Sequence, residues 1–365
     1  MVSFTPTEDQ QLLVDTIRRY ADKNIRPAAH DVDEAEAPDM DVIQAGWQLG
    51  LIPSALPEEL GGFGDMSAIS GAMIAEELAF GDLSVAMHLL APSLLAYPVT
   101  LFGTAAQRES LLPAFLEEEF TAATAAFLEP GMMFDPRAMQ TTATPSGDGV
   151  KLNGVKACVP LADESRALLV YARNAESGDI EAYIVPDDTP GLLIQEREKL
   201  MGLRALPTFR VKFEDAQVPV SAKLGGAVGI DIQTILNRQN VALGALAVGV
   251  ARAAFEYARE YAKERVQFGK AIAQNQSIAF MLAEMAIEVD ATRLMVWESA
   301  WMLDQGQDAT REAYLARQYA DKMVLTVTDS GVQTLGGYGF IREYPAERWL
   351  RNGRGFPTFD GLAIL

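Results

Sequence analysis

Cysteine and histidine are nearly absent from this sequence. Its 365 residues contain one cysteine, Cys158, and two histidines, His30 and His88, which lie far apart along the chain. One cysteine cannot form an intrachain disulfide or a cysteine zinc cluster, and two distant histidines are poor candidates for a metal site or a histidine base. We therefore expect no metal centre and no disulfide framework.

Several well-known catalytic and nucleotide-binding motifs are also missing. The sequence has no serine-nucleophile motif, no Walker loop and no His-Glu-x-x-His zinc motif. Basic residues are in the minority, with 30 lysines and arginines against 50 acidic residues and a formal net charge of −20. That balance argues against nucleic-acid binding, which needs basic surface for phosphates. It still permits a small anionic ligand held by a few local cations.

Long hydrophobic runs are missing as well. No 18 consecutive residues are all apolar, and no basic segment followed by an apolar one precedes the first predicted helix. We therefore predict a protein without a membrane span and without a secretory leader, located in the cytoplasm.

The sequence does contain enough apolar material for a large globular core. Hydrophobic residues make up 49% and charged residues 22%, and the length suggests two or three domains. Residues 1–118 show helical periodicity, residues 119–222 are rich in short β-like runs, and residues 223–365 return to helical periodicity. With these bounds we predict an all-α N-terminal domain, a middle antiparallel β-domain and a C-terminal four-helix-type bundle.

Short apolar runs bounded by Gly, Pro, Asp and Ser carry the β prediction. Residues 167–172, 180–185 and 209–213 are of this kind. Asn153-Gly154, which lies between two further runs, predicts the turn of a hairpin. The middle of the chain is therefore expected to form a small antiparallel sheet.

Three helical stretches of about 30 residues carry the bundle prediction. Residues 230–268, 275–303 and 310–335 are separated by short Gly- or Gln-rich breaks. Each would span ~45 Å at 1.5 Å per residue, and short breaks are typical of antiparallel neighbours in a bundle.

Two small clusters in this last zone can be interpreted in more than one way. Residues 336–339, Gly-Gly-Tyr-Gly, end a long predicted helix and so favour a helix C-terminal break over a dinucleotide-binding loop. Arg265 and Lys270 flank Phe268 and Gly269, which suits a diphosphate next to a flat ring, but equally a basic helix end that complements the helix dipole.

Taken together and in order, the motifs of the chain resemble those of the acyl-CoA dehydrogenase family over nearly the whole length. The resemblance is carried by Pro57 with Gly61, Gly62 and Gly64, Glu129-Pro130-Gly131, Met201-Gly202 with Arg204, Phe213 to Pro219, Arg265 to Lys270, Gln276 to Ala283, Gln333 to Phe340, Glu343-Tyr344-Pro345 and Glu347-Arg348. The family's layout of helical domain, β-domain and four-helix bundle agrees with the three zones.

The resemblance implies FAD-dependent α,β-dehydrogenation of an acyl-CoA thioester. In that family a carboxylate removes the α-proton, the β-hydrogen leaves as hydride to the flavin, and electron-transfer flavoprotein is the expected acceptor. It further implies a tetramer and a role in fatty acid or lipid catabolism. Residues that match the positions holding the adenosine and diphosphate of a neighbouring subunit's FAD are Arg265, Phe268, Gln276, Gln333, Gly336 and Gly337.

Positions that surround the chain's own flavin ring in this family depart from the family pattern. They are Phe127, Leu128, Phe134, Val159 and Pro160. Leu and Phe replace the usual threonine and serine hydroxyls, and Cys158-Val159-Pro160 replaces the usual Trp-Ile-Thr run. Proline has no backbone N–H to donate, and no indole is present there.

The catalytic base also departs from the family pattern. The family's Tyr-Glu-Gly-Thr corresponds to Phe359-Asp360-Gly361-Leu362, and the base position of a related subgroup is Gln239, which cannot take a proton. Asp360 is therefore the candidate base, although it is one methylene shorter and equally suits a loop cap. By the same resemblance, the candidate substrate-binding residues are Asn237, Asn240 and Gly361.

Three functional hypotheses follow. The chain is an active homo-oligomeric acyl-CoA dehydrogenase, or an oxidase of the same fold that uses Asp360 as its base. Alternatively, it is a partner subunit of a heterotetramer that lends its adenosine–diphosphate residues to a related subunit while its own ring pocket is reduced. The acyl chain cannot be read from these residues.

Overall fold

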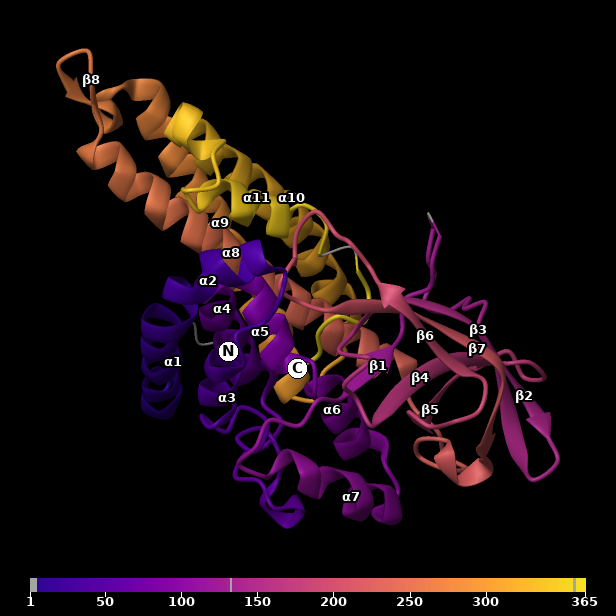
Figure 1. The fold of residues 1–365 in the computed structure, drawn as a ribbon. Coiled ribbons are helices and arrows are strands. Elements are labelled where there is room, and N and C mark those ends of the chain that lie inside the picture. The colour runs from indigo at the N-terminus through magenta and orange to yellow at the C-terminus, as the bar shows by residue number, and fades with distance from the viewer. Residues whose placement is uncertain (1–4, 132, 357–358) are drawn as a thin grey trace.

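A computed structural model of the chain describes residues 5–131, 133–356 and 359–365, and it begins with a domain of helices (Figure 1). The helices are α1 (Glu8–Tyr20), α2 (Arg26–Ala35), α3 (Met40–Trp47), α4 (Ala68–Gly81), α5 (Leu83–Leu90), α6 (Ser93–Phe102) and α7 (Ala105–Leu111), with shorter turns η1 (Ala21–Ile25), η2 (Glu58–Leu60) and η3 (Leu112–Phe115). Thr7 caps α1, because its hydroxyl accepts a hydrogen bond from the Gln10 backbone N–H at 3.2 Å.

The middle of the chain forms a seven-stranded sheet. Its strands are β1 (Thr124–Ala126), β2 (Thr142–Ser146), β3 (Gly149–Pro160), β4 (Ala167–Asn174), β5 (Ile180–Pro186), β6 (Leu192–Arg197) and β7 (Thr208–Pro219). The order is β1-β4-β2-β3-β7-β6, with β5 also paired to β4. The predicted β-domain is confirmed, and its pairs are antiparallel except for the short parallel pairs of β4 with β1 and with β2.

The predicted turn at Asn153-Gly154 is wrong. These two residues lie inside β3, at a register shift between Leu152 and Gly154 in the pairing with β7. Gly154 has a φ of 152°, and a Cβ there would lie 2.5 Å from Thr141 Oγ1. The glycine therefore serves a β-bulge, which needs the same backbone freedom as a turn. The β2–β3 turn itself is formed at Gly147 and Asp148.

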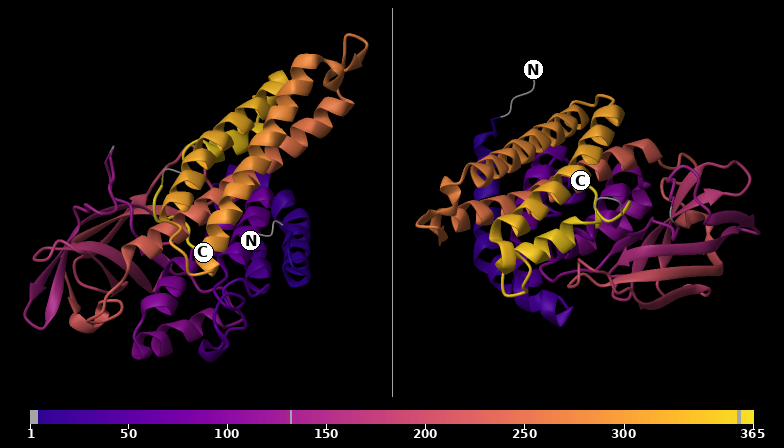
Figure 2. Two further views of the ribbon diagram at one scale, coloured as in Figure 1. Left: turned by 180° about the vertical axis from the view of Figure 1, so that it is seen from behind. Right: turned by 90° about the horizontal axis from the view of Figure 1, so that it is seen from above.

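The C-terminal zone is the predicted helical bundle. It consists of α8 (Ile232–Glu264), α9 (Gln276–Asp304), α10 (Thr310–Leu335) and α11 (Ala346–Gly353). A small hairpin of β8 (Val266–Gln267) and β9 (Lys270–Ala271) joins α8 to α9, followed by η5 (Ile272–Gln274), and η6 (Gly336–Gly339) follows α10. This hairpin and the sheet lie at opposite ends of the molecule (Figure 2).

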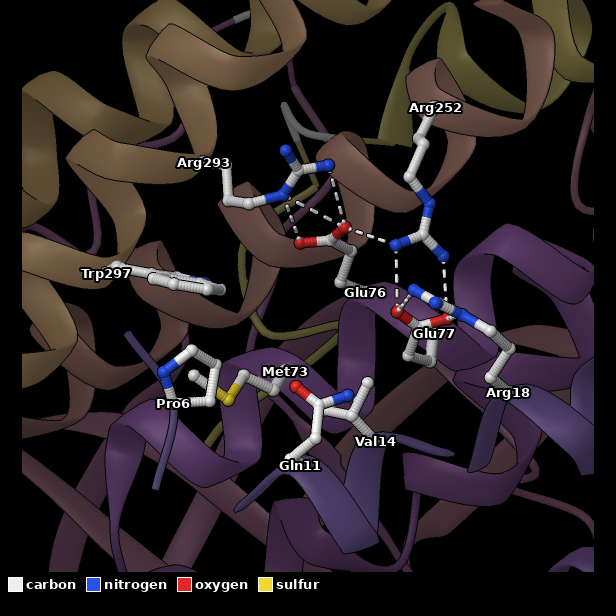
Figure 3. A pocket seen from close by; sticks show the side chains of 10 residues that line it. All are labelled: Pro6, Gln11, Val14, Arg18, Met73, Glu76, Glu77, Arg252, Arg293 and Trp297. Carbon is white, nitrogen blue, oxygen red and sulfur yellow. Dashed lines mark hydrogen bonds and ion pairs between the residues drawn. The ribbon is translucent and has the colours of Figure 1, made fainter. Parts of the chain in front are cut away.

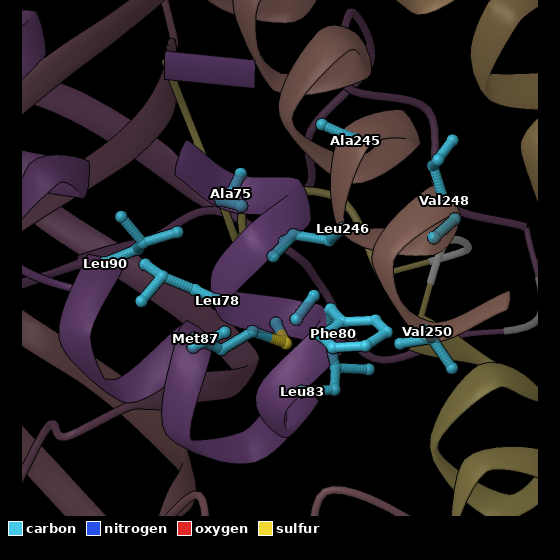
Figure 4. Packing of buried hydrophobic residues seen from close by; sticks show 14 of the residues in the cluster. Ala75, Leu78, Phe80, Leu83, Met87, Leu90, Ala245, Leu246, Val248 and Val250 are labelled. Carbon is cyan, nitrogen blue, oxygen red and sulfur yellow. The ribbon is translucent and has the colours of Figure 1, made fainter. Parts of the chain in front are cut away.

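Helix α8 forms the centre of the largest core. Its residues from Ile235 to Ala254 are all buried, and they pack on α4 as well as on α9 and α10. Figure 4 shows Leu246 and Val250 of α8 facing Leu78 and Phe80 of α4. Burial of apolar surface contributes ~25 cal/mol per Å², so this contact fixes the bundle on the N-terminal helices.

Two helical stretches are long and apolar enough to cross a membrane by length and composition alone. They are Leu83–Phe102 and Ile232–Glu264, and 89% and 83% of their most apolar windows are buried inside the protein. Core helices of globular domains have this same composition.

Candidate functional site

Asp360 lies at a cavity of about 540 Å³ between the bundle, the sheet domain and the C-terminal segment. The cavity is lined by Phe134, Pro136, Arg137, Gln233, Leu236, Asn240, Thr310, Arg311, Tyr314, Arg317, Gln318, Asp321 and Asp360. Three of the residues predicted from the sequence, Phe134, Asn240 and Asp360, therefore meet here.

Arg317 of α10 is the partner of Asp360, and the sequence analysis missed it. Its Nη1 donates to Asp360 Oδ1 in a short contact and to Asn240 Oδ1 of α8 at 3.1 Å. The side chains of Arg317 and Asp360 are 10% and 17% exposed. The available signal was an arginine between Ala316 and Ala320 on the apolar face of a predicted helix, since arginine is seldom buried without a partner.

The third predicted substrate residue on α8, Asn237, belongs to a polar network beside the cavity. Its side-chain oxygen accepts from Gln233 Nε2 at 2.6 Å, and its Nδ2 donates to Thr310 Oγ1 at 3.3 Å. Gln233 in turn accepts a short hydrogen bond from Arg137. The network links the first turns of α8 and α10 to the sheet domain.

Gly361, the remaining predicted substrate residue, packs against the core. Its φ is 83°, and a Cβ at this position would lie 2.3 Å from Phe127 Cβ. Buried backbone contacts hold the chain that follows Asp360: Arg238 Nη1 donates to the Leu365 carbonyl at 2.7 Å, and Ser93 Oγ donates to the Ile364 carbonyl at 3.3 Å. Asp360 is thus placed by packing of distant segments.

A second cavity, of about 500 Å³, lies near the β8–β9 end of the bundle. Arg265, Phe268, Gly336 and Gly337 line it, together with Tyr338. A Cβ at Gly336 or Gly337 would meet nothing within 4 Å, and Phe268 is 98% exposed. The cavity therefore offers open backbone, a cation and an apolar ring, which fit a diphosphate and a flat heterocycle.

Two of the predicted adenosine–diphosphate residues lie beside this cavity and do not line it. Gln276 is the first residue of α9, directly after Asn275, and Gln333 precedes Thr334 near the end of α10. Both Asn275 and Thr334 are lining residues. The structure thus brings four of the six predicted residues to one cavity wall.

The ring-side positions are filled by the chain's own apolar groups. Phe127 and Val159 are 1% exposed, and Pro160 is buried opposite Thr208 in the β3–β7 pair. Phe127 packs edge-on against Phe134 at 5.9 Å between ring centroids. These side chains have no polar atom with which to bind a flavin ring.

Three backbone donors on this side, those of Ala157, Cys158 and Leu161, are already used within the protein. The N–H of Ala157 donates to the carbonyl of Leu128 at 2.9 Å, and the N–H of Cys158 donates to Glu198 Oε2 at 2.8 Å. The N–H of Leu161 donates to Pro207 O at 3.0 Å. The residues near the second cavity therefore fit one half of FAD, whereas the apolar side chains and these three N–H groups of the same chain offer no donor to the other half.

A buried ion pair between Lys156 and Glu129 fixes β3 to the chain that follows β1. Lys156 is fully buried, and its Nζ donates to the Phe127 carbonyl at 2.9 Å and to Glu129 Oε1 at 3.0 Å. Burial lowers the pKa of Lys156 to about 8, against the opposing charge of Glu129. Glu129 also accepts from the backbone N–H groups of Gln140 and Thr141, so its role is structural.

A third cavity, of about 360 Å³, holds a cluster of ion pairs (Figure 3). Arg252 of α8 donates to Glu76 at 2.7 Å and to Glu77 at 2.8 Å, Arg293 of α9 binds Glu76, and Arg18 of α1 binds Glu77. Burial alone would lower the pKa of Arg252, but its hydrogen bond to Glu77 and the charge of Glu76 raise it. The three arginines and two glutamates attract one another across the cavity, so the cluster ties four helices together.

Profiles of one family match all three parts of the chain. The profile described as acyl-CoA dehydrogenase, N-terminal domain, matches residues 7–119, the middle domain matches residues 124–216, and the C-terminal domain matches residues 229–363.

Individual relatives agree with the profiles. A probable acyl-CoA dehydrogenase of Bacillus subtilis is 35% identical over 99% of this chain and 97% of its own length. The structure of butyryl-CoA dehydrogenase from Megasphaera elsdenii has a TM-score of 0.90 at 31% identity and covers 100% of this chain and 96% of its own. The FAD complex of PigA has a TM-score of 0.91 at 26% identity, with 99% and 96% covered.

Fold and relatives together define an oxidoreductase of the three-domain type that acts on acyl thioesters. The chain belongs to the acyl-CoA dehydrogenase family.

Proposed function

We propose that this chain is a subunit of a heteromeric acyl-CoA dehydrogenase that completes the FAD site of a related subunit. The observation that carries the proposal is the contrast between its two half-sites. The cavity at Arg265, Phe268, Gly336 and Gly337 is open. On the side expected to hold the flavin ring, the side chains are apolar. The backbone N–H groups of Ala157, Cys158 and Leu161 there are already bound within the chain. When bound across such an interface, FAD supplies the hydride acceptor for dehydrogenation.

An exposed apolar stripe supports assembly through the bundle. Phe280, Ile287 and Leu294 follow one another at seven-residue spacing on α9 and are 59%, 65% and 42% exposed. Seven residues are close to two helical turns, so the three side chains lie on one face. A related subunit bound here would cover this face, in line with a dimer of dimers.

This chain also has a site for the acyl thioester itself. The cavity beside Asp360 is open, and Asp360 is the candidate base for the α-proton. Because Arg317 engages one of its carboxylate oxygens, a substrate must either displace Arg317 or use the other oxygen. The second candidate function follows from this site. If this chain binds a flavin ring of its own next to the cavity, it is an active dehydrogenase with Asp360 as the base.

The cellular setting is part of the same proposal. We place the assembly in the cytoplasm, in fatty acid or lipid catabolism, with electron-transfer flavoprotein as the acceptor of its electrons. The proposal for the acceptor and the setting rests on family membership.

Flavin absorbance tests the half-site proposal. The purified chain should show little absorbance near 450 nm when expressed alone, and stoichiometric flavin when co-expressed with a related subunit that has an intact ring pocket. Losing three neutral hydrogen bonds to the ring, at ~1 kcal/mol each, weakens affinity by ~10².

A variant pair makes the test specific to the second cavity. In the co-expressed complex, Arg265→Ala should lower the flavin content, whereas Lys263→Ala, which is paired with Glu260 and does not line the cavity, should leave it unchanged. A stable homotetramer of this chain with one tightly bound FAD per subunit would disprove the proposal.

A further inference from the structure

The cavity beside Asp360 presents a fixed cation to any ligand that enters it. Arg317 is 9% exposed, and its guanidinium keeps its charge when it is buried. Its Nη1 donates to acceptors on two different segments, Asp360 and Asn240. Because α8, α10 and the C-terminal segment hold these three side chains independently, the cation is preorganised at the cavity wall.

Charged groups lie around this cation, next to apolar surface. The lining residues include Arg137, Arg311, Asp321 and Asp360, beside Phe134, Pro136, Leu236 and the ring of Tyr314. A hydrocarbon placed against Arg317 would remove water from charged groups without replacing their hydrogen bonds, which is unfavourable. A ligand that brings an oxygen to Arg317 avoids this loss.

We propose that Arg317 binds the acyl oxygen of the thioester in this cavity, with Asp360 as its counter-ion before the ligand arrives. The inference rests on the proposed function for its ligand class, an acyl-CoA thioester. It makes Arg317 a catalytic residue and Asn240 a positioning residue that holds the guanidinium.

The proton-transfer step explains why a paired cation suits this position. When the α C–H bond breaks, the proton passes to a carboxylate oxygen of Asp360 and the bonding electron pair moves to the acyl oxygen, which gives an enolate. Arg317 faces the Asp360 carboxylate before this step and the enolate oxygen after it. The guanidinium thus faces an anionic oxygen before and after the step, and a preorganised charge stabilises the oxygen on which negative charge develops.

A purely structural role for Arg317 makes a different prediction. If the ion pair with Asp360 only anchored the C-terminal segment to α10, replacing Arg317 would lower stability and weaken all ligands of the cavity alike. The decisive measurement is therefore discrimination between a ligand with the acyl oxygen and one without it.

The experiment compares two probes by titration calorimetry on the full chain. Butyryl-CoA has the acyl oxygen, and S-butyl-CoA, its thioether analogue, lacks only that oxygen. We expect the unaltered chain to prefer butyryl-CoA and Arg317→Met to weaken its binding by about tenfold, the scale of a charged hydrogen bond, while S-butyl-CoA changes less than about twofold. Arg317→Lys keeps the charge and should retain part of the preference.

Arg293→Met is the matched control, because it removes another largely buried arginine of the bundle at the remote Glu76 cluster. It should leave the ratio of the two affinities unchanged, and thermal unfolding of every variant verifies that it is folded. The proposal is overturned if Arg317→Met weakens both probes equally, if it weakens neither, or if the unaltered chain shows no preference for the thioester. Flavin content measures a different ligand at a different cavity, so the two proposals can fail separately.

Discussion

At the residue scale, Asp360 is the proposed base, and its carboxylate is one methylene shorter than the glutamate expected there from the family resemblance. Asp360 reaches the cavity because Gly361 packs against Phe127 and because the following backbone is bound by Arg238 and Ser93. A misplacement of ~1 Å can lower a rate by ~10², so the position of this carboxylate decides whether it acts. Arg317 and the packed C-terminal segment set that position.

Replacement of Asp360 by asparagine tests its role. Asp360→Asn should abolish exchange of the α-hydrogen of butyryl-CoA with deuterium from D2O, because an amide has no basic lone pair at neutral pH. The amide fills the same space but leaves Arg317 without its charged partner, so thermal unfolding is measured to verify that the variant is folded. Mass spectrometry of the recovered thioester measures the exchange, and equal exchange in both proteins would identify Asp360 as a loop residue.

The protonation of His88 is expected to make the stability of the fold depend on pH. It is fully buried, neither ring nitrogen has a protein partner among the described residues, and burial lowers its pKa from 6.5 to about 4. The unfolded chain therefore binds a proton on His88 at a higher pH than the folded chain does. Stability is then lost as pH falls from about 6.5 towards about 4, and the loss is complete below that window.

His88→Leu should remove this contribution. We expect the variant to be at least as stable as the unaltered chain at pH 7.5, since two unpaired buried nitrogens are removed, and to lose less stability between pH 7 and pH 5. Urea unfolding at several pH values measures both effects. His30→Gln, at an exposed position, is the control, and parallel pH profiles for His88→Leu and the unaltered chain would contradict the assignment.

At the element scale, ion pairs decide how the N-terminal helices attach to the bundle. Arg252 lies at the centre of the cluster because it binds both Glu76 and Glu77, which otherwise meet Arg293 and Arg18. Buried carboxylates that lose a partner are strongly destabilising, whereas an exposed pair contributes little.

Arg252→Met should therefore lower the free energy of unfolding by ~3–5 kcal/mol. Arg259→Met, on the same helix but at an exposed pair with Glu260, should change it by less than ~1 kcal/mol. Urea denaturation of both variants gives the comparison. A similar small effect from both would mean that the cluster is fully screened by water.

At the scale of the whole molecule, the exposed apolar stripe on α9 is the proposed contact with a related subunit. Ile287→Glu should dissociate the assembly, because a charge would be buried at the centre of the stripe. Leu12→Glu on α1 is a close control, since Leu12 is 66% exposed and Ile287 is 65% exposed. Light scattering gives the mass of each variant, and an unchanged mass for Ile287→Glu would remove α9 from the interface.

The order of helices and strands was predictable because it depends on local patterns. Period-3.6 and period-2 spacing report which face of an element is apolar, and the end of α10 at Gly336 follows from a glycine that adopts a positive φ. The family could be recognised from the sequence for the same reason, because each of its motifs is a short stretch of adjacent residues.

Contacts between distant segments were decided only by the tertiary structure. Asn153-Gly154 has the sequence of a turn, but the neighbouring Thr141 and the pairing of β3 with β7 make it a bulge. No spacing rule links Arg317 to Asp360, which meet because α10 and the C-terminal segment pack side by side. The sequence determined which side chains stand at each position. Packing decided which backbone donors are already hydrogen-bonded within the chain, as those of Ala157, Cys158 and Leu161 are, and which surfaces stay open, as the cavity at Arg265 does.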